Sequence, residues 1–252
     1  MVVIAAYLMV AYLLLPTIWK HYEYQSGLAG QPMVTHTAQG IPGDAINVGL
    51  VGTREDVTRA MHEAGWYPAD PITLKSSIEI IGSVLLKRPY RDAPVSPLYY
   101  DGRREDLAFE KPVGESADRR QHVRFWQVLA IGEEGRPVWL GSVTFDRDVG
   151  ISHYTGAVTH HIAPDIDATR DALIGDLVAA HMVTAIYQVG GVGPTLYARN
   201  GEGDPYYTDG EVKVARLVVD DEKSMAAPQM LPPPSLVEIK DAMWRAGQSA
   251  LR

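Results

Sequence analysis

The stretch His122-Val-Arg-Phe-Trp-Gln-Val-Leu129 shows a clear alternation of side-chain types. Successive side chains of a β-strand point to opposite faces of its sheet. His122 and Arg124 are therefore expected on one face. Val123 and Phe125 are expected on the other face, which is apolar. The stretch predicts a strand with one face in a hydrophobic core and polar groups on the other.

Further strands are expected on both sides of this one. Residues 137–145 form an apolar run, and the Gly-rich loop 132–136 before it predicts a hairpin. Thr53 with Asp56 is typical of a helix N-terminus. The other expected strands are 46–51, 151–154, 157–162, 182–189, 195–198 and 211–219, and helices are expected at 73–86 and from 164–167 onward. Strands clustered with a few helices predict a single α+β domain with a mostly antiparallel sheet and packing helices.

The N-terminal residues differ from the rest of the chain. No charged side chain occurs from Val2 to Trp19, and about 20 apolar residues are needed for a helix that spans a bilayer. We expect one transmembrane helix here, and therefore a single-pass membrane protein. A cleaved signal peptide and a buried N-terminal helix are the alternatives. Lys20 alone does not decide on which side of the membrane the domain lies.

This expectation divides the chain into four parts. They are a transmembrane anchor at 1–20, a linker at 21–44, an α+β domain at 45–220, and a Pro-containing linker with an amphipathic helix at 221–252. Leu236, Ile239, Met243 and Ala250 form the apolar stripe of that helix. The stripe is expected to dock on the domain, and contact with a membrane or a partner is the alternative.

Composition restricts the classes of function. The formal charge is −8, which argues against a nucleic-acid partner. Cysteine is absent, which excludes disulfides and thiolate chemistry. Residues 87–124 hold nine basic and seven acidic side chains, against the acidic balance of the whole. This segment is either a local surface for anionic lipid or phosphate, or a solvated loop of alternating charge.

Several short motifs, in order along the chain, resemble the LssY C-terminal domain family. They are Pro94–Tyr99, Gly102–Phe109 with Lys111-Pro112, His122–Trp126, Gly141–Asp146, Thr159–Ile162 with Pro164–Asp167, and Tyr206–Gly210. The resemblance implies a bacterial, membrane-associated domain. Some members of the family carry type 2 phosphatidic acid phosphatase-like or DedA-like membrane domains, and this family context favours an extracytoplasmic domain. It supplies neither catalytic residues nor a cofactor.

Two histidines followed by two acids suggest a metal site. The candidate ligands are His160, His161, Asp165 and Asp167, whose donor atoms suit zinc or another divalent ion. Neighbouring residues on a strand point to opposite faces, so only one histidine of the pair can reach a given site. His122 and His153 are the residues that would complete it. Alternatively, the acids cap a helix and a histidine forms a hydrogen bond within the sheet.

The same region suggests a phosphate site without a metal. The candidate catalytic residues are His122, Arg124, His153 and His160. Arginine offers a bidentate fork to a phosphoryl group, and histidine offers a titratable proton. Arg103 and Arg104, on a loop ahead of the strand, join Arg124 as candidate anion-binding residues. Salt bridges with nearby acids are the structural alternative.

Three functions remain open at this point. The first is a membrane-anchored accessory module that binds a partner membrane protein or a phospholipid headgroup. The second is a phosphate-ester hydrolase that uses histidine and aspartate, with a divalent metal as its possible cofactor. The third is a subunit that stabilises a larger membrane complex. Each has the lipid bilayer as a partner.

Overall fold

Strands β8 (Arg120–Leu129) and β9 (Val138–Ile151) form the expected hairpin. The structure is a computed structural model, and it describes residues 2–10, 12, 24–28, 30–69, 73, 75, 98–114, 119–156, 158–220, 222–233 and 235–251. Strand β9 continues past residue 145 as far as Ile151, so the separate strand expected at 151–154 is absent from the described residues. The C-terminal part of β9 pairs with β10 (Val158–Ile162) in an antiparallel arrangement.

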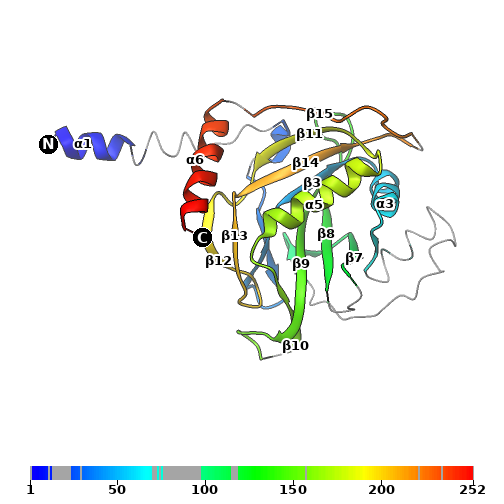
Figure 1. Ribbon diagram of the computed structural model, residues 1–252, viewed down its shortest axis with the longest axis horizontal. Helices are drawn as coiled ribbons and strands as arrows, with labels where there is room; N and C mark the ends of the chain where they lie inside the picture. Colours follow the sequence, from blue (N-terminus) through cyan, green and yellow to red (C-terminus); the bar gives the residue numbers. More distant parts are fainter. Residues whose placement is uncertain are drawn as a thin grey trace.

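The main sheet contains nine of the described strands, in the order β15-β11-β14-β3-β9-β8-β7-β4, with β10 beside β9 (Figure 1). The bounds of its remaining members are β3 Val48–Val51, β4 Tyr67–Pro68, β7 Leu107–Pro112, β11 Val183–Gly190, β14 Glu211–Leu217 and β15 Gln229–Met230. Two pairs, β14 with β3 and β11 with β15, are parallel, and the others are antiparallel. The α+β class is therefore confirmed.

Helices α3 (Arg54–Glu63) and α5 (Ile166–Ala179) contribute to the core on one face of this sheet. Thr53 and Asp56 form the expected capping box at the start of α3, which satisfies two backbone N–H groups there. The core beneath the helices includes Val123 and Phe125 of β8, as their alternation predicts.

A smaller sheet lies against the opposite face. Its order is β2-β1-β5-β6, with bounds β1 Val34–Thr37, β2 Pro42–Ala45, β5 Leu98–Tyr100 and β6 Arg103–Arg104. The 3-10 helix η2 (Ser26–Leu28) also packs here, and Leu28, Leu98 and Trp126 belong to one buried cluster. Strands β12 (Thr195–Arg199) and β13 (Pro205–Thr208) form a separate hairpin.

The folded domain begins before the expected boundary at residue 45. Residues 34–44, expected within a linker, contain β1 and most of β2, and Thr35 and Leu28 are buried. The Gly, Pro and Thr content of this segment predicts a linker. The same residues are also common in turns and short edge strands, so composition alone does not distinguish the two. The helix expected over 73–86 falls outside the described residues, except for Thr73 and Lys75.

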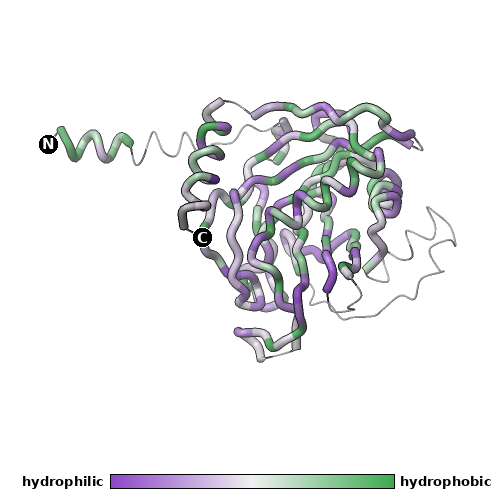
Figure 2. The backbone as a smooth tube through the Cα atoms, viewed as in Figure 1, coloured by the Kyte–Doolittle hydropathy of each residue, from purple (hydrophilic) through white to green (hydrophobic). Residues whose placement is uncertain are grey.

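At the N-terminus, helix α1 (Val2–Met9) carries only exposed side chains. Figure 2 shows its hydrophobic residues extending away from the rest of the protein. Among the described residues, no helix has both the length and the hydropathy needed to cross a bilayer.

At the C-terminus, helix α6 (Ser235–Leu251) exposes two residues of the apolar stripe that was expected to dock. Val237, Lys240 and Asp241 are buried, whereas Ile239 and Met243 of the apolar stripe are exposed. The Lys240 ammonium pairs with Glu211 at the start of β14 and lies 3.0 Å from the Asp241 carboxylate. A buried ion pair and the buried Val237 therefore lie where the helix contacts the domain.

Candidate functional site

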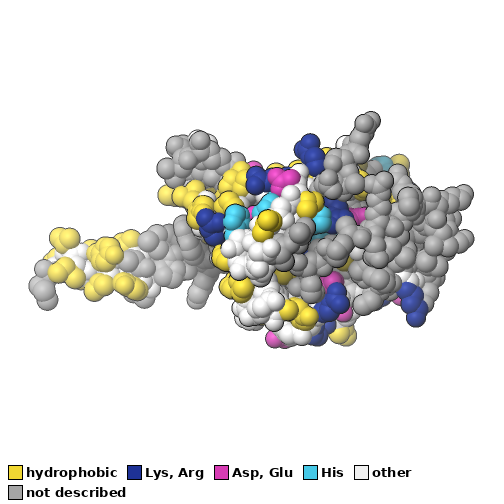
Figure 3. Space-filling view, turned by 90° about the horizontal axis from the view of Figure 1, so that it is seen from below, with side chains coloured by type: hydrophobic (Ala, Val, Ile, Leu, Met, Phe, Trp, Pro, Cys, Tyr) yellow, Lys and Arg dark blue, Asp and Glu magenta, His cyan; other side chains and the backbone are white. Residues whose placement is uncertain are grey.

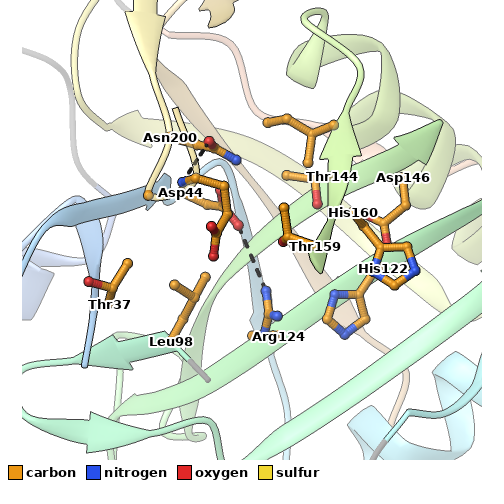
Figure 4. A pocket seen from close by; sticks show the side chains of 13 residues that line it. Thr37, Asp44, Leu98, His122, Arg124, Thr144, Asp146, Thr159, His160 and Asn200 are labelled. Carbon is orange, nitrogen blue, oxygen red and sulfur yellow. Dashed lines mark hydrogen bonds and ion pairs between the residues drawn. The ribbon is translucent and has the colours of Figure 1, made fainter. Parts of the chain in front are cut away.

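A small cleft opens at the end of the main sheet that carries β10. Its walls come from β8, β9 and β10, from β1, β2 and β5, and from the loop between β12 and β13 (Figure 4). The lining side chains labelled there are Thr37, Asp44, Leu98, His122, Arg124, Thr144, Asp146, Thr159, His160 and Asn200. The cavity measures about 50 Å³, which suits one small polar group, since drug-sized ligands need about 300–1,000 Å³.

His122 and Arg124 reach this cleft from the polar face of β8. Each faces a partner on β9, His122 opposite Thr144 and Arg124 opposite Ser142. Both side chains are buried, with exposed fractions of 2% and 5%. The prediction that they share one face is confirmed, and the opposite face of β8 lies in the core.

Buried ion pairs support the floor of the cleft. The Arg124 guanidinium lies 3.7 Å from the Asp44 carboxylate (Figure 4). Behind His122, Arg120 is 3.3 Å from Asp146 and 2.9 Å from a carboxylate oxygen of Glu110. Such pairs hold the side chains in fixed positions, because breaking one leaves a buried charge without its counter-ion.

Burial changes the proton affinity of several of these groups. It lowers the pKa of His122 well below that of a free imidazole, and the charges of Arg124 and Arg120 lower it further. Burial raises the pKa of Asp146 and of Asp44, although the neighbouring arginines oppose that shift. Opposite shifts of a base and an acid in one cleft are typical of functional sites.

His160 and His161 separate, as the strand geometry predicts. His160 lines the cleft near His122 and Asp146 (Figure 4). His161 instead contacts Asp204, with 2.6 Å between Nδ1 and Oδ1. His153, in the turn between β9 and β10, places its Nε2 3.9 Å from the same oxygen. Histidines also reach the surface at the β10 end of the molecule (Figure 3).

The four expected metal ligands do not converge. Asp165 caps α5 by accepting a hydrogen bond from the Ala168 N–H. Asp167 accepts hydrogen bonds from the Thr208 hydroxyl and the Asp209 N–H, and it pairs with Arg170. Burial raises the pKa of Asp167 to about 6. Both acids therefore serve the start of α5, which is the alternative that the sequence left open.

The two loop arginines lie apart from Arg124. Arg103 donates to the carbonyl of Gln127 and lies 3.5 Å from Asp106. Arg104 pairs with its neighbour Glu105. Both arginines are exposed on β6, and neither lines the cleft.

Several residues in or beside the cleft are not among the candidate site residues predicted from the sequence. Ser142, Thr144 and Asp146 put a polar group at every second position of β9, so the period that identified His122 also marks them. The Gly-rich composition of the loop Gly201–Pro205 predicts a flexible loop that could form the rim of a site, but it does not identify Asp204 as the residue that contacts the histidines. No local pattern marks Asp44, whose role depends on β2 packing over Arg124.

The family comparison agrees with the motifs. Residues 28–212 match the model of the family described as LssY C-terminus, and this range covers the cleft and its supporting strands. Neither curated proteins nor solved structures gave a match.

Proposed function

Because the chain belongs to the LssY C-terminus family, we propose that the function lies in the cleft formed by the matched region, and that it is the hydrolysis of a phosphate ester near a membrane surface. One observation supports the proposal above all. Three adjacent strands direct His122, Arg124, Asp146 and His160 into a single small polar cavity.

The chemistry follows from the charge states of these groups. Arg124 would contact a phosphoryl oxygen through its guanidinium. His122, which is neutral because its pKa is lowered, would accept a proton from the attacking water. Asp146 is a diagonal neighbour of His122 across the β8–β9 pair and has a raised pKa, so it would donate a proton to the leaving oxygen.

The acids of the cleft limit when an anion can bind. Asp44 already pairs with Arg124, so a phosphoryl group must compete with Asp44 for the guanidinium group. Protonation of Asp44, whose pKa is raised by burial, removes that competition. We therefore expect phosphate binding to strengthen as the pH falls.

Hydrolysis can be tested with the full chain in mild detergent. The probes are a nitrophenyl phosphate monoester and a nitrophenyl phosphate diester. His122→Gln and Arg124→Met are each expected to lower the rate by about 100-fold or more, since a positioned acid or base contributes about 10²–10⁴-fold. Arg103→Ala is the matched control and is expected to keep the wild-type rate, because Arg103 lies outside the cleft.

The same measurements distinguish hydrolysis from binding alone. If inorganic phosphate stabilises the wild type but not Arg124→Met, and no ester is cleaved, the chain is a headgroup-binding module. If phosphate has no effect on stability and no ester is cleaved, both forms of the proposal fail.

A membrane tether is the second part of the proposal. It is favoured by α1, whose described side chains are all apolar or aromatic and all exposed, and by the uncharged sequence that continues to Trp19. The full chain should float with lipid vesicles, and a variant that lacks residues 2–19 should not. Co-purification of the full chain with another membrane protein would favour the accessory-subunit form of this proposal.

A further inference from the structure

Three nitrogen and oxygen donors meet beside the cleft but outside it. They are Nε2 of His153, Nδ1 of His161 and Oδ1 of Asp204, and the ligand atoms of the three residues all lie within 4.8 Å of one another. The three residues come from the β9–β10 turn, from β10 and from the β12–β13 loop. We propose that they bind one divalent transition-metal ion, with Zn²⁺ as the reference ion. The inference concerns metal binding and does not depend on the proposed hydrolysis.

The distances are compatible with coordination. Two ligands of a tetrahedral Zn²⁺ ion lie about 3.3 Å apart, given metal–ligand bonds of about 2.0 Å. The observed separations from the Asp204 oxygen are 2.6 Å to His161 and 3.9 Å to His153, one shorter and one longer than that value. Both separations lie within about 0.7 Å of the tetrahedral value, and no two of the ligand atoms are more than 4.8 Å apart.

The carboxylate is already held in the orientation that a metal ligand needs. Asp204 has an exposed fraction of 1%, and its Oδ2 accepts a hydrogen bond of 3.0 Å from the Ile162 N–H. This contact leaves Oδ1 directed toward the two imidazoles. Outer contacts that orient a ligand in this way are a regular part of metal sites.

Two glycines leave room for the imidazole rings. A Cβ at Gly150 would lie 2.2 Å from His161 Nε2, and a Cβ at Gly203 would lie 2.6 Å from the Cβ of His153. The backbone also joins the two loops, since the His153 N–H donates to the carbonyl of Glu202. The close approach of the rings to Asp204 therefore depends on positions without a side chain.

The site is open on one side. The His153 side chain has an exposed fraction of 58%, whereas that of His161 is 16%. Three protein ligands with an open fourth position are typical of catalytic rather than structural zinc. Asn200 links this site to the cleft, because its Oδ1 accepts a hydrogen bond from the Asp204 N–H while its amide contacts Asp44.

The test is calorimetric titration of chelator-treated full chain with Zn²⁺, which requires no activity. We expect one equivalent of Zn²⁺ per chain. His153→Ala and Asp204→Asn should each weaken the affinity by at least about tenfold, since even the loss of an outer contact costs 10–100-fold. Asn at position 204 keeps the acceptor for the Ile162 N–H, so this variant retains its local support.

The control is His36→Ala, which removes an exposed histidine on β1. This variant should bind Zn²⁺ as tightly as the wild type. The absence of one-to-one binding in the wild type would overturn the proposal, as would an affinity that His153→Ala leaves unchanged. Cleavage of a phosphate ester without Zn²⁺ binding would contradict the metal site and leave the proposed hydrolysis intact.

Discussion

His160 and His161 are adjacent on β10 but belong to two different polar sites. His160 lines the cleft that holds His122 and Arg124, whereas His161 lies 2.6 Å from Asp204. The strand itself makes this division, because neighbouring side chains leave it in opposite directions. A substitution at one position should therefore affect one site and spare the other.

The first prediction concerns the close approach of Gly150 to the His161 imidazole. Gly150→Ala should weaken Zn²⁺ affinity by about tenfold or more, because the added Cβ would displace the imidazole from Asp204. Gly175→Ala is the matched control. It lies in α5 with open space around the added Cβ, and should leave Zn²⁺ affinity unchanged while raising stability by about 0.5–1 kcal/mol. Titration calorimetry and thermal unfolding measure the two effects.

The buried Arg120 gives a prediction about stability. Arg120→Met should lower the free energy of unfolding by about 3–5 kcal/mol, because Glu110 would lose its counter-charge and Asp146 its hydrogen-bond donor. Arg104→Ala, which removes an exposed arginine that pairs with Glu105, should cost at most about 1 kcal/mol. Urea denaturation compares them, and equal losses would show that Arg120 is not a structural anchor.

The lowered pKa of His122 predicts a pH dependence. The folded protein keeps this imidazole neutral, whereas the unfolded chain takes up its proton near a pH of about 6.5. Below that pH the unfolded state binds more protons than the folded state. The free energy of unfolding therefore decreases as the pH is lowered. Relative to His122→Gln, the wild type should lose up to about 1.4 kcal/mol per pH unit until the folded-state pKa is reached.

This difference is measured by urea denaturation of both proteins at about pH 7.5 and pH 5.5. Comparison with the variant cancels contributions from other titrating groups such as Asp167, whose pKa is also shifted. Parallel pH profiles of the two proteins would contradict the neutral, buried state of His122.

Substitution of Asp165 tests whether this acid caps α5 or binds a metal ion. Asp165→Ala should lower the free energy of unfolding by about 1 kcal/mol, because the Ala168 N–H loses its cap. Zn²⁺ affinity should not change. A variant with weaker Zn²⁺ binding and unchanged stability would instead make Asp165 a ligand.

The docking of α6 can be tested by comparing its two faces. Val237→Ala should cost about 1–2 kcal/mol, since it removes buried apolar groups. Ile239→Ala should change the free energy of unfolding by less than about 0.5 kcal/mol, since Ile239 is exposed. Thermal unfolding measures both, and the reverse order would mean that the apolar stripe is the docking face.

The sequence by itself determined the local features. The two faces of β8, the capping box of α3, the hairpin of β8 and β9, and the separation of His160 from His161 were all predicted. Each depends on backbone geometry within a few residues, so a pattern of period two or a cap is sufficient to identify it.

Only the tertiary structure decided which side chains meet. Asp204 reaches His161 across 43 positions of sequence, and Asp44 reaches Arg124 from the opposite sheet. The docking face of α6 depends likewise on Glu211, a residue of β14. These contacts result from the packing of distant segments, and no periodicity encodes them, because each segment alone satisfies its local rules without its partner.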